Sequence, residues 1–251
     1  MLGNKVAERG INYMSLILNS GVTIGPGMVL DAGYIPPPTI ITDGLVLHYD
    51  FSDINCYGIS FSAITDLSTA ANNGTIVNDA GAIVGGSDVR GNTFITWQTN
   101  AGNTYSNSSI QTASQNTYTD FTIVFQPDFT ATGMIGLFAV EADKSVRFGT
   151  NGLGGWGIAN PGDANDWAYL NPTTYYINGQ ASDLPVAGWN IIGGARTNNT
   201  WTMPNGLYIG TSDYPNRHFQ GSIALVLMYN RALTEQEQLQ NYNVLRARFG
   251  L

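Results

Sequence analysis

The nine residues GSIALVLMY, positions 221–229, constrain the fold of this 251-residue chain more than any other segment. In an extended chain, successive side chains point to opposite faces. One face would carry Ile223, Leu225, Leu227 and Tyr229, and the other would carry Ala224, Val226 and Met228. A strand that is apolar on both faces has to be covered on both. The sequence therefore predicts a strand in the interior of a sheet.

A capped amphipathic helix is predicted directly after this strand. Thr234 and Glu237 have the T-x-x-E spacing of a capping box, which satisfies backbone N–H groups at a helix start. Gly250 is the residue type that most often follows a helix end. Apolar residues recur every three or four positions between these caps, at Leu239, Tyr242, Leu245 and Phe249. This stripe is expected to face the core.

The remaining chain after residue 41 has the pattern of short strands separated by turns. Candidate strands at 44–53, 120–129, 134–142 and 145–150 are bounded by Gly, Asn, Asp or Pro. The pair Asn178-Gly179 predicts a two-residue hairpin turn. The polar region 60–118 is expected to hold short edge strands and long loops. The predicted fold is therefore all-β, with a short C-terminal helix.

Three segments resemble laminin-G-like domains of the concanavalin A-like lectin and glucanase superfamily. They are the opening strand GLVLHYDFSD from Gly44, the central YYINGQASDLPVAGWNIIG with NGLYIGTSD, and a C-terminal signature running from YNRALT to RFG. The resemblance covers residues 41–251. It implies a two-sheet antiparallel jelly-roll sandwich in which the opening strand lies beside the closing strand. The superfamily includes binding, catalytic and structural members, so the fold by itself does not assign a function.

Charge and composition argue against several classes of partner. Ten Lys and Arg against 18 Asp and Glu give a net charge of −8, and no basic run with interleaved aromatics is present. Nucleic acid is therefore not expected as a partner. No segment approaches the roughly 20 apolar residues of a membrane helix, so membrane insertion is not expected either. Cys56 is the single cysteine and is predicted to be a core residue rather than a nucleophile.

Residues 1–40 differ in composition from the rest and are predicted to form an extended N-terminal arm with a Pro-rich spacer at Pro36, Pro37 and Pro38. The apolar side chains that need cover are Leu16, Ile17, Leu18, Val22, Ile24, Met28, Val29 and Leu30. An arm this apolar is expected to be buried against something else. It could pack on its own sandwich, but docking onto another subunit is the preferred interpretation, and this docking also allows a homo-oligomer.

Catalysis is not predicted. Retaining glucanases of the superfamily carry three acids at alternate positions of one strand, which points a nucleophile and an acid/base into one cleft. Glu141 and Asp143 have this spacing, but Ser145 occupies the position of the third acid. A solvated turn at a strand end is the preferred interpretation. The protein is expected not to be an enzyme.

No metal site is predicted either. His48 and His218 are the only histidines, and they lack the spacing of a zinc motif. Calcium is kept as an alternative, because laminin-G-like relatives sometimes hold it at one rim of the sandwich. Its candidate ligands by residue type are Asp50, Asp53, Asp163 and Asp166. Otherwise no cofactor is expected.

The preferred functional prediction is a non-enzymatic virion structural protein. The tract NSGVTIGPGM, residues 19–28, resembles tracts that precede such modules in structural proteins of tailed phages. The resemblance implies a laminin-G-like module displayed on a phage particle, as a capsid decoration or a tail component. The expected location is the virion and the expected partners are other capsid or tail proteins, which the arm would bind.

The alternative is a carbohydrate-binding adhesion module that recognises host-surface glycans. Aromatic faces with nearby amide and carboxylate groups suit the apolar faces and the hydroxyls of sugars. Trp156, Asp163, Asp166 and Trp167 are the candidate glycan-binding residues. Both functions could belong to one displayed module.

Overall fold

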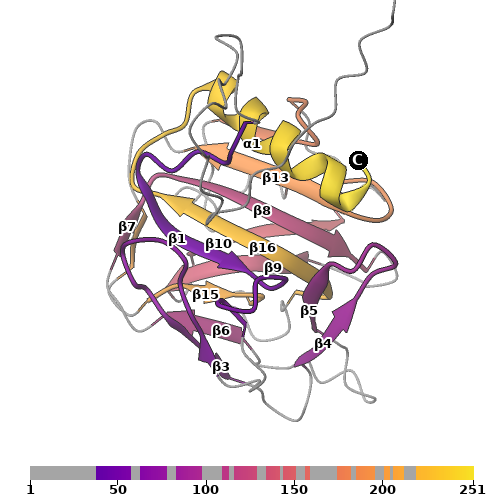
Figure 1. The fold of residues 1–251 in the computed structure, drawn as a ribbon, viewed down its shortest axis with the longest axis horizontal. Coiled ribbons are helices and arrows are strands. Elements are labelled where there is room, and N and C mark those ends of the chain that lie inside the picture. Colours follow the sequence, from indigo (N-terminus) through magenta and orange to yellow (C-terminus); the bar gives the residue numbers. More distant parts are fainter. Residues whose placement is uncertain are drawn as a thin grey trace, which may run out of the picture. The chain divides into compact units, whose positions relative to one another are not determined.

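The computed structural model describes the chain from residue 38 onward, with gaps. Two large antiparallel sheets, one separate two-stranded sheet and a C-terminal helix, α1 (Glu235–Phe249), make up the regular structure of this part (Figure 1). The prediction of an all-β two-sheet sandwich with a short C-terminal helix is confirmed. The described residues are 38–57, 63–77, 83–97, 109–112, 116–128, 134–141, 144–150, 156–158, 174–181, 185–195, 201–203, 206–211 and 219–251.

The first sheet, called sheet A, contains the closing strand β16 (Gly221–Tyr229). Its strand order is β12-β13-β8-β16-β5-β4, and β1 also pairs with β16. The other strands are β12 (Thr174–Ile177), β13 (Asn190–Ala195), β8 (Asp120–Pro127), β5 (Thr93–Trp97), β4 (Ile83–Ser87) and β1 (Leu45–Asp50).

The second sheet, sheet B, has the order β11-β10-β9-β15-β6-β3-β2. A separate two-stranded sheet pairs β14 (Trp201–Met203) with β7 (Asn116–Tyr118). The strands of sheet B are β11 (Trp156–Ile158), β10 (Lys144–Thr150), β9 (Met134–Glu141), β15 (Tyr208–Ile209), β6 (Ser109–Thr112), β3 (Gly74–Val77) and β2 (Ala63–Ile64).

The region 60–118 is richer in structure than predicted. It supplies six short strands, β2 to β7, of which β2 and β4 end their sheets whereas β3, β5 and β6 each pair on both sides. The interior positions of β3, β5 and β6 were missed because short strands among Asn, Ser and Thr carry little periodicity.

Strand β16 lies in the interior of sheet A, as its sequence predicts. Strand β8 pairs along one edge of β16, while β5 and β1 share the other edge, β5 at residues 221–223 and β1 at residues 225–229. The opening strand therefore lies beside the closing strand, and that prediction is confirmed. The arrangement joins the two ends of the domain in one sheet.

The predicted division of β16 into two faces is wrong at its beginning. Its register against β8 shifts between Ile223 and Leu225, so Ala224 is an extra residue on this strand. A β-bulge of this kind shifts the side-chain alternation by one. Ile223 consequently joins Val226 and Met228 in the core between the sheets, whereas Ala224 packs with Leu225 on the helix side.

The opening strand shows the same effect. Its register against β16 shifts between Leu45 and Leu47. Leu47, Tyr49 and Phe51 lie in the core between the sheets, whereas Leu45, which strict alternation would place on the same face, packs on the helix side of sheet A. A one-residue register shift is enough to move a side chain to the opposite face.

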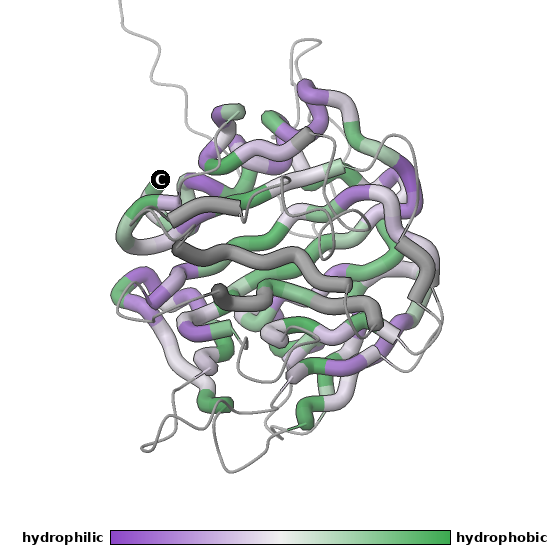
Figure 2. Tube along the Cα trace, turned by 180° about the vertical axis from the view of Figure 1, so that it is seen from behind, coloured by the Kyte–Doolittle hydropathy of each residue, from purple (hydrophilic) through white to green (hydrophobic). Residues whose placement is uncertain are grey.

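Sheet A thus lies between two apolar cores. The inner core fills the space between the sheets, and the outer core packs sheet A against α1 through residues such as Trp189, Leu245 and Phe249. In Figure 2, seen from behind, hydrophobic stretches shown in green recur along the strands. Cys56 is buried in the inner core, as predicted, and burial raises the pKa of its thiol to about 12.

Both predicted caps of α1 are present. The Thr234 hydroxyl accepts a bond from the backbone N–H of Glu237, whose carboxylate accepts from the backbone N–H of Thr234 at 2.8 Å. Gly250 has a φ of 75°, the left-handed conformation that glycine adopts most easily at a helix end. Arg231 binds the same Glu237 carboxylate with two bonds, of 2.6 and 3.0 Å.

The predicted apolar stripe of α1 is wrong at Leu239, which is 44% exposed. The buried residues of the helix are Gln238, Asn241, Leu245 and Phe249. The apolar pattern misplaced the buried face because sheet A presents polar groups to the first half of α1. Amide side chains satisfy these groups, as described below. Within the described ranges, no helix has the length and apolar character needed to cross a lipid bilayer.

Candidate functional site

The structure describes little of the predicted glycan-binding set. Asp163, Asp166 and Trp167 lie outside the described residues, and Trp156 is described only as the first residue of β11. The predicted anchoring residues, from Leu16 to Leu30, also lie outside them. Both sets remain predictions.

Of the two acids considered for catalysis, only Glu141 lies within the described residues. Glu141 ends β9 and pairs with Lys144, which begins β10. Asp143 lies between these strands, outside the described residues. Of the calcium candidates, Asp50 binds Arg248 through two bonds, and the side chain of Asp53 accepts bonds from Asn55. In the part of the chain that the structure describes, no three His, Cys, Asp or Glu side chains gather as metal ligands would.

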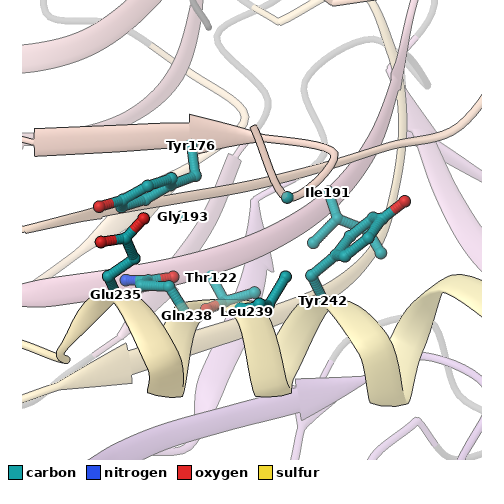
Figure 3. A pocket seen from close by; sticks show the side chains of 9 residues that line it. Thr122, Tyr176, Ile191, Gly193, Glu235, Gln238, Leu239 and Tyr242 are labelled. Carbon is teal, nitrogen blue, oxygen red and sulfur yellow. The ribbon is translucent and has the colours of Figure 1, made fainter. Parts of the chain in front are cut away.

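A small pocket between α1 and one end of sheet A is the best candidate for a binding site. We call it the helix–edge pocket; Figure 3 shows it from close by. It opens where edge strand β12 and its neighbour β13 pass the first half of the helix. Its lining residues are Thr122 of β8, Tyr176 of β12, Gly179 after it, Ile191 and Gly193 of β13, and Glu235, Gln238, Leu239 and Tyr242 of α1.

Two glycines let the helix approach the sheet. A Cβ atom at Gly193 would collide with the side-chain oxygen of Gln238, and a Cβ atom at Gly179 would lie 2.6 Å from the ring of Tyr242. Both distances are too short for real contacts, so a larger residue would push the helix side chains away. Because both positions are glycine, the backbone of the sheet itself lines this part of the pocket.

The turn at one end of the pocket has the predicted form. Asn178 and Gly179 have φ values of 52° and 73°, which is the pattern of a type I′ hairpin turn. Ile177 and Gln180 exchange two backbone bonds across this turn. The side chain of Asn178 accepts a bond from the backbone N–H of Ile191 at 2.9 Å. These bonds fix the turn to β13, and they also fix the end of edge strand β12, which carries Tyr176.

A buried polar network orients the helix side of the pocket. Strand β8 points Asp120 and Thr122 toward α1. The side-chain NH₂ of Gln238 donates to Asp120 at 2.6 Å, and that of Asn241 donates to the hydroxyls of Thr122 at 3.2 Å and Tyr229 at 3.0 Å. Because its nitrogen is engaged below, Gln238 presents its oxygen toward Gly193 and the pocket.

The two ends of the pocket differ in charge. In Figure 3 the Glu235 carboxylate lies beside the ring of Tyr176, whereas Tyr242 lies at the opposite end. Burial raises the pKa of Tyr176, and the negative charges of Glu235 and Asp120 raise it further. At the other end, the guanidinium of Arg246 lies 5.7 Å from the centre of the Tyr242 ring.

These groups suit a polar ligand with apolar faces. Tyr176 and Tyr242 are half-buried and flank Leu239, while Glu235 and Gln238 offer oxygen acceptors. Pockets of this type bind through aromatic contact and a few oriented polar groups. Glu235 is the single carboxylate among the described lining residues, so the pair of acids that most glycosidases use is not formed by them. The arrangement supports binding.

Sequence reasoning missed this pocket, although partial signals were present. Asp120 and Thr122 alternate with Phe121 and Ile123, which indicates a strand with polar side chains on one face and apolar side chains on the other. Gly193 and Gly194 stand in the middle of an otherwise apolar strand, where glycine often marks close approach of another element.

No family model and no curated protein matches this chain. Solved structures match it at low identity. Domain 4 of AbnA, a GH43 extracellular arabinanase from Geobacillus stearothermophilus, in complex with arabinotriose, is 15% identical; the match covers 80% of this chain and 100% of that one, with a TM-score of 0.46.

Two further structures are similar over part of their length. The binding domain of Paraclostridial Mosquitocidal Protein 1 is 17% identical, with 80% of this chain and 52% of that one covered and a TM-score of 0.42. A Trypanosoma rangeli sialidase is 15% identical, with 79% and 33% covered and a TM-score of 0.42. This chain thus spans about half of the first and a third of the second. The laminin-G-like family remains a prediction from the sequence.

Proposed function

We propose that this protein is a non-enzymatic carbohydrate-binding β-sandwich module and that the helix–edge pocket is a glycan-binding site. The carrying observation is the pair of half-buried tyrosines, Tyr176 and Tyr242, set on either side of oxygen acceptors. Sugars have apolar C–H faces that pack on aromatic rings and hydroxyls that donate to carboxylate and amide oxygens.

The rigidity of the pocket supports this proposal. Tyr176 lies on a strand closed by a bonded turn, and Gln238 is fixed by Asp120. Side chains held in this way lose little conformational entropy when a ligand binds. A weak, hydroxyl-rich ligand can therefore be recognised without a deep cavity.

Replacing Tyr176 by alanine is expected to weaken glycan binding roughly ten-fold, because the loss of one aromatic contact is worth about 1.4 kcal/mol. Ligands would first be found on a glycan array, and affinities would then be measured by titration calorimetry. Tyr208→Ala is the matched control, since Tyr208 is a half-buried tyrosine of β15 in the other sheet. Melting curves would show that both variants are folded.

One outcome of these measurements would place the glycan site elsewhere in the protein. If Trp167→Ala abolishes binding while Tyr176→Ala leaves it unchanged, the helix–edge pocket is not the glycan site and the Trp156–Trp167 region is. If the array shows no ligand at millimolar concentration, the carbohydrate-binding function itself is wrong.

We further propose that the module is displayed on a phage particle through residues 1–40. This proposal is supported by sequence alone, through the eight apolar side chains of the arm and the tract that resembles those of tailed-phage proteins. Each large apolar side chain buried in a neighbouring protein stabilises the contact by roughly 1.5–3 kcal/mol before entropy losses. An arm of this composition could anchor the module stably.

Deleting residues 2–35 is expected to leave a folded module that no longer joins its particle. Incorporation would be measured by the amount of protein that co-sediments with purified particles. Glycan binding should be unchanged, because the helix–edge pocket lies wholly after residue 38. Continued incorporation of the truncated chain would show that the arm is not the anchor.

A further inference from the structure

We propose that the helix–edge pocket selects sugars that carry a protonated amine, such as glucosamine-containing glycans, and that Glu235 and the ring of Tyr176 form the subsite for the amine. This inference rests on the proposed carbohydrate-binding function and adds the class of sugar.

The first support is the charge of the pocket. Glu235 is the one charged residue among the described residues that line it. Its side chain is exposed, and among the described residues no hydrogen bond or ion pair engages its carboxylate. The carboxylate of Glu237, two residues further along the helix, already accepts hydrogen bonds from Arg231 and from the backbone N–H of Thr234. Glu235 is therefore free to pair with a cation from a ligand.

The second support is that Arg231 and Arg246, which the structure describes just before α1 and within it, are engaged elsewhere. Arg231 binds Glu237 and also contacts Asp43, at 2.7 Å. Arg246 lies over Tyr242, at the end of the pocket opposite to Glu235. Neither guanidinium neutralises the Glu235 carboxylate, whose charge would stabilise a ligand ammonium placed there.

The third support is the combination of groups at that end. The ring of Tyr176 lies beside the Glu235 carboxylate. An aromatic face and a carboxylate both attract an ammonium group. A sugar hydroxyl in the same place would gain only a hydrogen bond between a neutral donor and the carboxylate. An N-acetyl group would gain even less from the charge.

The test compares three tetrasaccharides, made of glucosamine, N-acetylglucosamine and glucose, on the full chain. Affinities are measured by titration calorimetry at pH 6, where the glucosamine amines are protonated. The glucosamine ligand is expected to bind at least ten-fold more tightly than the other two. In Glu235→Gln, which keeps the shape and removes the charge, this preference is expected to disappear while binding of the neutral ligands persists.

The control variant is Asp53→Asn, which removes one negative charge from the loop after β1, outside the pocket. It should keep the preference, which separates pairing at Glu235 from a general effect of net charge. Added salt should reduce the preference in the unmodified protein. Equal affinities for amine and neutral sugars, or a preference unchanged in Glu235→Gln, would overturn this inference and leave the carbohydrate-binding function standing. No binding of any sugar would overturn both.

Discussion

Replacing Trp189 by alanine is expected to lower the free energy of unfolding by about 3–5 kcal/mol. The indole is 8% exposed. Its ring centre lies 5.4 Å from that of Phe94 and 5.3 Å from that of Phe249. Trp189 thus joins three elements, the β4–β5 hairpin, the start of β13 and the last turn of α1. Alanine would leave a cavity where these elements meet, because none of them can close the gap without moving a strand.

Urea unfolding followed by far-ultraviolet circular dichroism measures this effect without relying on tryptophan emission. Val186 offers a matched control, since it lies in the same loop three residues earlier and is 51% exposed. Val186→Ala is expected to change the free energy of unfolding by less than about 0.5 kcal/mol. A loss below about 1 kcal/mol in Trp189→Ala would show that α1 is not held to sheet A through this residue.

Features that depend on neighbouring residues could be predicted from the sequence. The caps at Thr234 and Gly250 and the turn at Asn178-Gly179 follow from local backbone chemistry, and each is present. The β-bulges could not be predicted in this way. Whether Ala224 is an extra residue depends on the register between β16 and β8, which are about 100 residues apart in the chain.

The helix–edge pocket depends even more on distant pairings. Its residues come from β8, β12, β13 and α1, and antiparallel pairing together with the packing of the helix brings them into contact. Leu239 illustrates the difficulty. Apolar periodicity favours its burial, but the buried carboxyl of Asp120 requires a polar partner, so Gln238 occupies the buried position instead. Hydrogen-bond satisfaction outweighed the hydrophobic pattern at this point.

Asp120 is a buried carboxyl group that binds the start of α1 and the loop before it. It is fully buried, and its carboxyl accepts bonds from the backbone N–H of Leu233 at 2.7 Å and from the side chain of Gln238 at 2.6 Å. Burial raises the pKa of Asp120 to about 8, and the hydrogen bonds oppose this rise without overcoming it. An unfolded Asp side chain titrates near pH 3.8. The folded and unfolded states therefore bind different numbers of protons over a wide pH range.

The stability of the protein is expected to fall as pH rises from about 4 to 8. Between these values the folded state keeps the Asp120 proton and the unfolded state has lost it, so each pH unit favours unfolding, by about 1 kcal/mol. The contribution of Asp120 to stability is fully present below pH 3.8, and it is lost once the pH exceeds the pKa of Asp120 in the folded state. His48 acts in the opposite sense below pH 6.5, because burial lowers its pKa. A comparison with a variant isolates Asp120.

Asp120→Asn provides that comparison. The amide keeps one acceptor for Leu233, and its NH₂ can donate to Gln238 if the Gln238 amide turns over, so both bonds survive without a titrating group. The difference in free energy of unfolding between Asp120→Asn and the unmodified protein should shift by several kcal/mol between pH 5 and pH 8, in favour of the variant as pH rises. Urea titrations at pH 5, 6, 7 and 8 would measure it. A difference that stays constant over this range would mean that Asp120 is ionised in the folded state, with Leu233 and Gln238 outweighing the effect of burial.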